Sequence, residues 1–119
     1  MPGEPPISGL VIAREIGRFG VNFVVRLDGQ RLGWCECLAD LTNGGELPAL
    51  RDWAELGELW VEADWRNRGI GAWLVKQATA YLRLAGCDRI VLSVDSRDEV
   101  AGAGRFYRRF GWEVLARIT

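Results

Sequence analysis

The sequence of 119 residues contains no histidine and only one lysine, Lys76. Without an imidazole, a zinc site and a catalytic triad with a histidine base are not expected. A Walker phosphate loop needs a glycine-lysine pair followed by serine or threonine, and Lys76 lies well inside a predicted helix. A nucleotide-binding loop of the Walker type is therefore not expected either.

Cysteines are few and lack the paired spacing of a metal site. The three cysteines are Cys35, Cys37 and Cys87. Cys35 and Cys37 are two residues apart in a predicted strand, so both side chains point to the same face. Metal or redox chemistry would need further ligands, so packing is the favoured role for both residues. We therefore expect no bound metal.

Long apolar runs are also missing. No stretch approaches the ~20 apolar residues that a membrane span needs, and the polar, proline-rich start does not have the pattern of a signal peptide. The net charge is only −1, which does not favour a general nucleic-acid surface. We therefore expect a cytoplasmic protein that binds neither membranes nor nucleic acids.

Length and composition predict one domain. With 119 residues, 49% of them hydrophobic, the chain can bury a moderate core but not two independent ones. Residues 1–9 are expected to form a flexible lead and residues 10–119 a single domain. Tryptophan occurs six times, and most of these side chains are expected in the core or in a subunit contact.

The first half of the chain predicts strands. Asp28 and Gly29 separate two β-rich runs, which is a strong hairpin signal. A loop with Thr42 and Pro48 follows the hairpin. The expected strands cover residues 10–16, 21–27, 30–38 and 54–62.

The second half predicts helices alternating with strands. Residues 71–85 carry apolar side chains at three- and four-residue steps, and Gly86 fits a helix end. The expected buried stripe contains Leu74, Ala78, Tyr81, Leu82 and Ala85. A buried strand at 89–94, parallel to the fourth strand, a helix at 100–110 and a last strand at 112–118 complete a mixed α/β sheet.

Residues 59–72 form the stretch around which the chain is organised: a strand, a tight loop and a helix start. A helix start presents unpaired N–H groups and partial positive charge, and Gly69 and Gly71 would let a bulky anion approach them. Arg66 and Arg68 add positive charge. A phosphate-like ligand with more than one negative charge is predicted. A dinucleotide fingerprint is not, because only two of its three glycines are present.

Two motifs resemble the GNAT superfamily of acyl-CoA N-acyltransferases. Residues 61–71, Val-Glu-Ala-Asp-Trp-Arg-Asn-Arg-Gly-Ile-Gly, are similar to the family's strand end and pyrophosphate loop, with Ala63 in place of the usual proline. Residues 103–112, Ala-Gly-Arg-Phe-Tyr-Arg-Arg-Phe-Gly-Trp, resemble the family's second block. The resemblance implies a GNAT-like fold, acetyl-CoA as co-substrate and an amine as acceptor.

The resemblance also implies the binding residues. Backbone amides at the end of the fourth strand would hold the acyl and pantetheine groups, and the loop and helix start would hold the pyrophosphate. The implied acetyl-CoA-binding residues are Leu59, Trp60, Val61, Arg66, Asn67, Arg68, Gly69, Ile70, Gly71, Ala72 and Phe106.

For catalysis, the resemblance implies that Tyr107 is the general acid that protonates the coenzyme A sulfur. The alternative is that Tyr107 is an aromatic residue of the core with no catalytic role. Glu55 and Glu58 are the candidate bases. Alternation along the strand places Glu55 on one face with Leu59 and Val61, and Glu58 on the other, unless a bulge intervenes.

Two departures from the family bear on function. Val100 stands where the family often has asparagine, and there is no room for the two helices that the family usually places between its first two strands. An uncovered sheet face would expose apolar surface, so we predict a homodimer or a partner domain. A non-catalytic acyl-CoA-binding or interaction module is the alternative to an enzyme.

Overall fold

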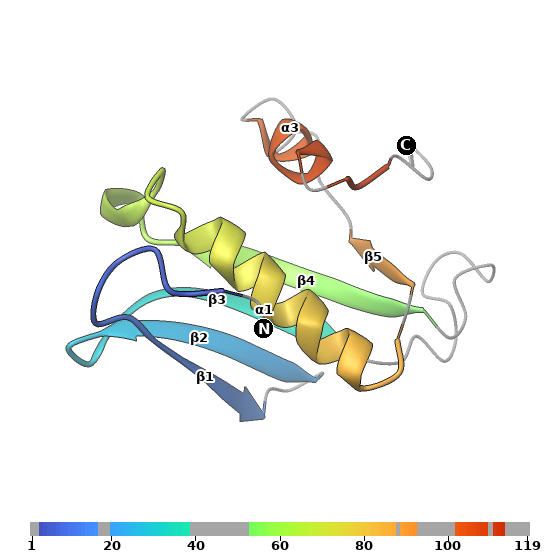
Figure 1. The fold of residues 1–119 in the computed structure, drawn as a ribbon, viewed down its shortest axis with the longest axis horizontal. Coiled ribbons are helices and arrows are strands. Elements are labelled where there is room, and N and C mark those ends of the chain that lie inside the picture. Colours follow the sequence, from blue (N-terminus) through green and yellow to red (C-terminus); the bar gives the residue numbers. More distant parts are fainter. Residues whose placement is uncertain are drawn as a thin grey trace.

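The computed structural model describes residues 3–16, 20–38, 53–87, 89–92, 102–109 and 111–113. Five strands form one sheet in the order β1-β2-β3-β4-β5 (Figure 1). The first four strands are antiparallel neighbours and β5 runs parallel to β4, as predicted for a mixed sheet. The strands are β1 (Val11–Ile16), β2 (Val21–Leu27), β3 (Gln30–Leu38), β4 (Ala54–Val61) and β5 (Ile90–Leu92).

The predicted hairpin joins β2 to β3. Asp28 and Gly29 both have positive φ, 51° and 83°, and Leu27 pairs with Gln30 across the turn. Two positive φ values define a type I′ turn, whose twist matches that of the flanking strands. The turn therefore sets the register of β3 against β2.

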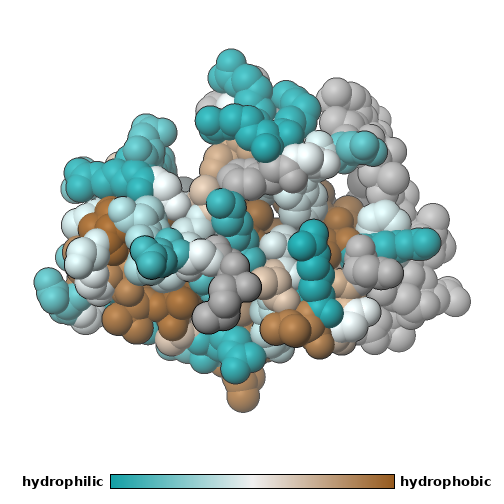
Figure 2. Space-filling model, in the orientation of Figure 1, coloured by the Kyte–Doolittle hydropathy of each residue, from teal (hydrophilic) through white to brown (hydrophobic). Residues whose placement is uncertain are grey.

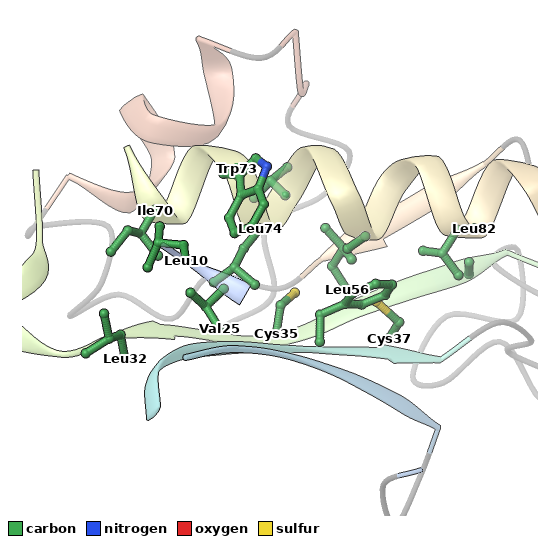
Figure 3. Packing of buried hydrophobic residues seen from close by; sticks show 14 residues of the cluster. Leu10, Val25, Leu32, Cys35, Cys37, Leu56, Ile70, Trp73, Leu74 and Leu82 are labelled. Carbon is green, nitrogen blue, oxygen red and sulfur yellow. The ribbon is translucent and has the colours of Figure 1, made fainter. Parts of the chain in front are cut away.

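One long helix covers one face of the sheet. After β4 come the short 3-10 helix η2 (Ala63–Trp65) and then α1 (Ile70–Leu84), and α3 (Ala103–Arg108) follows β5. Figure 3 shows α1 above the sheet with the core side chains between them. The buried side chains of α1 are Ile70, Trp73, Leu74, Val75, Ala78 and Leu82.

Most of the predicted stripe on α1 is confirmed. Tyr81 is half-buried and meets the Phe23 ring edge-on, with 5.5 Å between ring centroids. Ala85 is exposed, so its predicted burial is wrong. The reason is that α1 ends at Leu84 and Ala85 is already the C-terminal cap.

Gly86 ends α1 as predicted. Its φ is 92°, its N–H donates to the Arg83 carbonyl at 3.0 Å, and the Cys87 N–H donates to the Leu82 carbonyl at 2.9 Å. These two bonds form a Schellman motif, which needs a left-handed residue and so favours glycine.

Cys35 and Cys37 lie in the core, as predicted. Their side chains are 0% and 1% exposed. A hydrogen bond with Cys37, followed by burial, raises the pKa of the Cys35 thiol far above its ordinary value. A thiol held in its neutral form is a poor nucleophile and metal ligand, which agrees with a packing role.

β4 contains a bulge. Cys35 of β3 pairs with Leu59, and Cys37 pairs with Leu56. Two residues along β3 therefore correspond to three residues along β4, so β4 contains one extra residue. The extra residue changes the alternation, so Leu56 and Leu59 both contact the core while Glu55 points to the opposite face. The prediction that Glu55 shares a face with Leu59 is therefore wrong.

We call the sheet surface opposite α1 the outer face. Val61 also packs against the core, so the predicted common face of Val61 and Glu55 is wrong for the same reason. A second irregularity lies between β2 and β3, where the partner moves from Gly33 to Arg31 as β2 advances from Val25 to Arg26, so that Arg31 takes the face of Arg26. Alternation, with both bulges included, assigns these side chains to the outer face: Val11, Ala13, Glu15, Asn22, Val24, Arg26, Arg31, Trp34, Glu36, Leu38, Glu55 and Trp60.

Residues 3–10 run across the core side of the fold. The side chain of Leu10 is 7% exposed, Ile7 packs against the core, and Trp73 Nε1 donates to the Gly3 carbonyl at 3.5 Å. This stretch, where the sequence predicts a flexible lead, contacts α1 near the start of that helix. The flexibility itself stays a prediction.

Elsewhere the bounds differ slightly from those predicted. The second predicted helix is shorter, because Gly102 precedes α3 with a φ of 100°. Of the predicted last strand, only Trp112 and Glu113 are described and neither is in a strand. The four-residue connection between β1 and β2 leaves no room for two helices. None of the described helices has the length and apolar character needed to cross a membrane.

Candidate functional site

The start of α1 presents unpaired backbone donors. Gly69 caps the helix with a φ of 88° and no side chain hydrogen-bonds to this cap. The first turn of a helix has no intrahelical acceptors for its N–H groups, here those of Ile70, Gly71 and Ala72. Together with the helix dipole, these donors form a site for an anion.

Glycine at position 71 keeps this helix start accessible. A Cβ built on Gly71 would lie 3.5 Å from the Phe106 ring and 3.8 Å from the Val61 side chain. The structure thus brings the end of β4, the start of α1 and α3 together around one glycine. Asn67, with a φ of 63°, helps the loop turn into the helix.

The two loop arginines each lie over a tryptophan ring. Arg66 Nε donates to the Val61 carbonyl at 2.8 Å, and its guanidinium carbon is 4.5 Å from the centre of the Trp60 ring. Arg68 lies over Trp65 at 4.9 Å. Arg66 therefore ties the loop to the end of β4 and reaches the outer face, while phosphate contact by either side chain stays a prediction.

α3 adds positive charge that the motif analysis did not include. Arg105, Arg108 and Arg109 are exposed on and just after this helix, and Figure 2 shows a hydrophilic surface over it. Because Phe106 places α3 against the start of α1, this charge favours anions there. The run Arg-x-x-Arg-Arg around Tyr107 is the feature of the sequence that could have indicated this positive charge.

Within the described part of the chain, β4 has a strand neighbour on its β5 side over only part of its length. β5 pairs with β4 only from Ala54 to Leu56. Among the described residues, no strand continues along that edge toward Leu59 and Val61. A ligand lying there could use backbone hydrogen bonds of β4, as predicted for the acyl and pantetheine groups.

Tyr107 lies beside the residue that contacts Gly71. Its ring meets the Phe106 ring edge-on at 5.1 Å and the Trp112 ring at 5.9 Å. Tyr107 is half-buried and packs against the core. The packing fixes the ring, so the predicted acid role and the alternative core role are compatible with this position.

Glu55 lies on the outer face of β4, in the part of this strand that pairs with both β3 and β5. Desolvation, and then the negative charge of Glu36, raise the pKa of Glu55 above its ordinary value. A raised pKa makes a carboxylate a stronger base near neutral pH. The sequence alone does not indicate the effect of Glu36 on Glu55, because only the pairing of β3 with β4 brings the two carboxylates close together. The side chain of Glu58, the other candidate base, lies outside the described part of the chain.

Replacing Glu36 with glutamine is expected to lower the pKa of Glu55, because ionisation is easier without a neighbouring negative charge. Desolvation is the larger cause and is unchanged, so the pKa should stay above its ordinary value. Carboxyl NMR titration measures the shift. Glu15→Gln, on the outer face but on β1, is the control and should leave Glu55 unchanged. An unaltered pKa in Glu36→Gln would contradict the electrostatic coupling.

No metal centre is formed in the part of the chain that the structure describes. It contains no group of three or more His, Cys, Asp or Glu side chains that could hold a metal ion.

Comparison with known proteins supports the resemblance. A family model described as the acetyltransferase (GNAT) family matches residues 5–112. An uncharacterized N-acetyltransferase of Methanocaldococcus jannaschii is 33% identical over 91 residues, which cover 76% of this chain and 38% of that protein. The chain therefore spans about two fifths of the length of this relative.

Solved structures show the same fold. A putative acetyltransferase from Deinococcus radiodurans has a TM-score of 0.69 at 19% identity and covers 100% of this chain and 92% of its own. An aminoglycoside N-acetyltransferase in complex with CoA has a TM-score of 0.67 at 18% identity, over 83% of this chain and 63% of that one. With the motifs, the sheet and the match over residues 5–112 taken together, the chain belongs to the acetyltransferase (GNAT) family.

Proposed function

We propose that this chain transfers an acetyl group from acetyl-CoA to an amine. The observation that carries the proposal is the start of α1, which has no side-chain cap, beside the stretch of β4 after Leu56 that has no β5 neighbour among the described residues. One end of this site suits a pyrophosphate and the other suits an extended amide-containing arm. Acetyl-CoA has both parts in this order.

The residues present fit such a ligand. The amides of Ile70, Gly71 and Ala72 point out of the first helical turn, where phosphate oxygens accept hydrogen bonds. The Phe106 ring lies over Gly71 and offers an apolar surface to the arm. The aminoglycoside N-acetyltransferase with the same fold is a complex with CoA, which supports this assignment.

The proposed acid and base approach the reaction from opposite sides. Tyr107 packs on the core side of the sheet with α1, whereas Glu55 lies on the outer face. Glu55 accepts a proton from the protonated amine, and the neutral nitrogen then attacks the thioester carbonyl. As the carbon–sulfur bond breaks, Tyr107 donates its phenolic proton to the departing thiolate. The nitrogen releases its second proton to water, and the Tyr107 phenolate regains a proton from water. The transfer is direct and forms no covalent enzyme intermediate.

A non-catalytic acyl-CoA-binding module is the second candidate. It is favoured by the four-residue connection between β1 and β2, which leaves the outer side of Glu55 without the wall that two helices would form. Val100, in place of the family's asparagine, points the same way but lies outside the described residues. Binding without turnover distinguishes this module from an enzyme.

Calorimetric titration with acetyl-CoA tests the proposal. We expect one-site, saturable binding, and S-acetylpantetheine should bind at least about ten-fold more weakly because it lacks the pyrophosphate. Absence of acetyl-CoA binding would contradict both candidate functions. If acetyl-CoA binds, release of free thiol with a panel of amines supports the enzyme, and no release with any amine supports the binding module.

A further inference from the structure

Charged side chains on the outer face are divided between its two ends. Arg26 and Arg31 lie at the end where β2 turns into β3, and Arg66 joins them by lying over Trp60. The acidic side chains lie toward the opposite end of the strands: Glu15, Glu36 and Glu55. This separation leaves one end of the face basic and the other end acidic.

Ion pairs within the chain neutralise only part of the charge at the two ends of the outer face. Arg26 and Glu15 approach to 3.5 Å, with side chains 38% and 46% exposed. An exposed pair of this kind contributes less than about 1 kcal/mol. Arg31 instead lies over the Trp34 ring at 4.1 Å. Charge therefore remains available to a partner at both ends of the face.

A row of apolar side chains crosses the sheet between the charged ends. Strand pairing joins Ala13 to Val24, Val24 to Trp34, and Trp34 to Trp60. Val24 is 2% exposed although it lies outside the core cluster. Trp60 is 40% exposed, and its ring centre is 6.2 Å from that of Trp34. Partly exposed tryptophans surrounded by charge are typical of protein interfaces.

Symmetry limits how two copies of this face can meet. A two-fold axis between two facing sheets must run parallel to the sheet planes. If the axis ran along the strands, it would place the basic end of one copy on the basic end of the other. If it ran across the strands, each basic end would face the acidic end of the other copy. Electrostatic complementarity therefore selects the second arrangement.

We propose that the outer face binds a second copy of this chain through a two-fold axis across the strands, at the row of Trp34 and Trp60. The two sheets then pack face to face, as in a β-sandwich. β3 lies over β3 of the second copy, with Trp34 near the axis. Arg31 and Glu36 lie on either side of Trp34 along β3, so Arg31 of each copy faces Glu36 of the other.

Charge-reversal variants test this arrangement. The unmodified protein is expected to sediment as a dimer in analytical ultracentrifugation. Arg31→Glu or Glu36→Arg should raise the dimer dissociation constant by roughly 100-fold or more, because the symmetric interface repeats each like-charge contact twice. The double variant Arg31→Glu/Glu36→Arg should restore the dimer, because it exchanges the two charges. An equal mixture of the two single variants should form a mixed dimer.

The control is Lys76→Glu, which reverses one charge on the exposed surface of α1 and should leave the dimer unchanged. Circular dichroism confirms that each variant is folded. A monomer at all concentrations would overturn the proposal, as would a dimer that both single reversals leave intact. Failure of the double variant to restore dimerisation would overturn the proposed axis. None of these outcomes depends on acetyl-CoA, so they are separate from the test of the proposed function.

Discussion

Gly71→Val is expected to weaken acetyl-CoA binding by at least about 100-fold, because branched methyl groups would cover the amides that receive the pyrophosphate. A Cβ at this position would be in ordinary contact with Phe106 at 3.5 Å and with Val61 at 3.8 Å, so the two further methyl groups of valine add bulk where β4, α1 and α3 meet. Stability should change by less than about 1 kcal/mol, since valine is a better helix former than glycine. Calorimetry measures binding and urea denaturation measures stability.

Gly86→Ala provides the matched control at the other end of α1. No atom lies within 4 Å of a Cβ at this position, but the φ of 92° strains any residue other than glycine. This variant should lose roughly 1 kcal/mol of stability and keep its affinity for acetyl-CoA. Normal acetyl-CoA binding by Gly71→Val would refute the assignment of the helix start as the pyrophosphate site.

Tyr107→Phe is expected to lower kcat by about 100-fold while leaving the acetyl-CoA Kd unchanged, because only the proton donor is removed. The phenylalanine ring can keep the edge contacts with Phe106 and Trp112, so the fold should be retained. Steady-state kinetics with an accepted amine, together with calorimetry, separate catalysis from binding.

The second tyrosine of the chain serves as the control. Tyr81 contacts Phe23 on the core side of β2, and Tyr81→Phe should keep both kcat and the acetyl-CoA Kd. If Tyr107→Phe retained full kcat, Tyr107 would be a packing residue only and another group would have to protonate the thiolate. A loss confined to the acetyl-CoA Kd would instead place Tyr107 in binding.

Features that depend on a few neighbouring residues could be predicted from the sequence. The hairpin at Asp28 and Gly29, the end of α1 at Gly86 and the start of α1 near Gly69 all require backbone angles that few residues adopt without strain. The family motifs were recognisable for the same reason, since they describe one loop and one helix. These local requirements are enough to predict the strand-loop-helix unit and the class of ligand.

Features that depend on pairing between distant segments could not be predicted. The bulge of β4 between Leu56 and Leu59 turns Glu55 away from Leu59. The pairing of β3 with β4 brings Glu36 within electrostatic reach of Glu55. The position of Arg66 over Trp60 likewise depends on how the loop folds back on β4.

The sequence by itself therefore determined the β2–β3 hairpin and the strand-loop-helix unit from β4 to α1, because backbone propensities act over a few residues. The tertiary structure decided which face each side chain of β4 takes, and so the division of charge on the outer face. A single bulge reverses strand alternation, and its position depends on cross-strand pairing that no local pattern encodes.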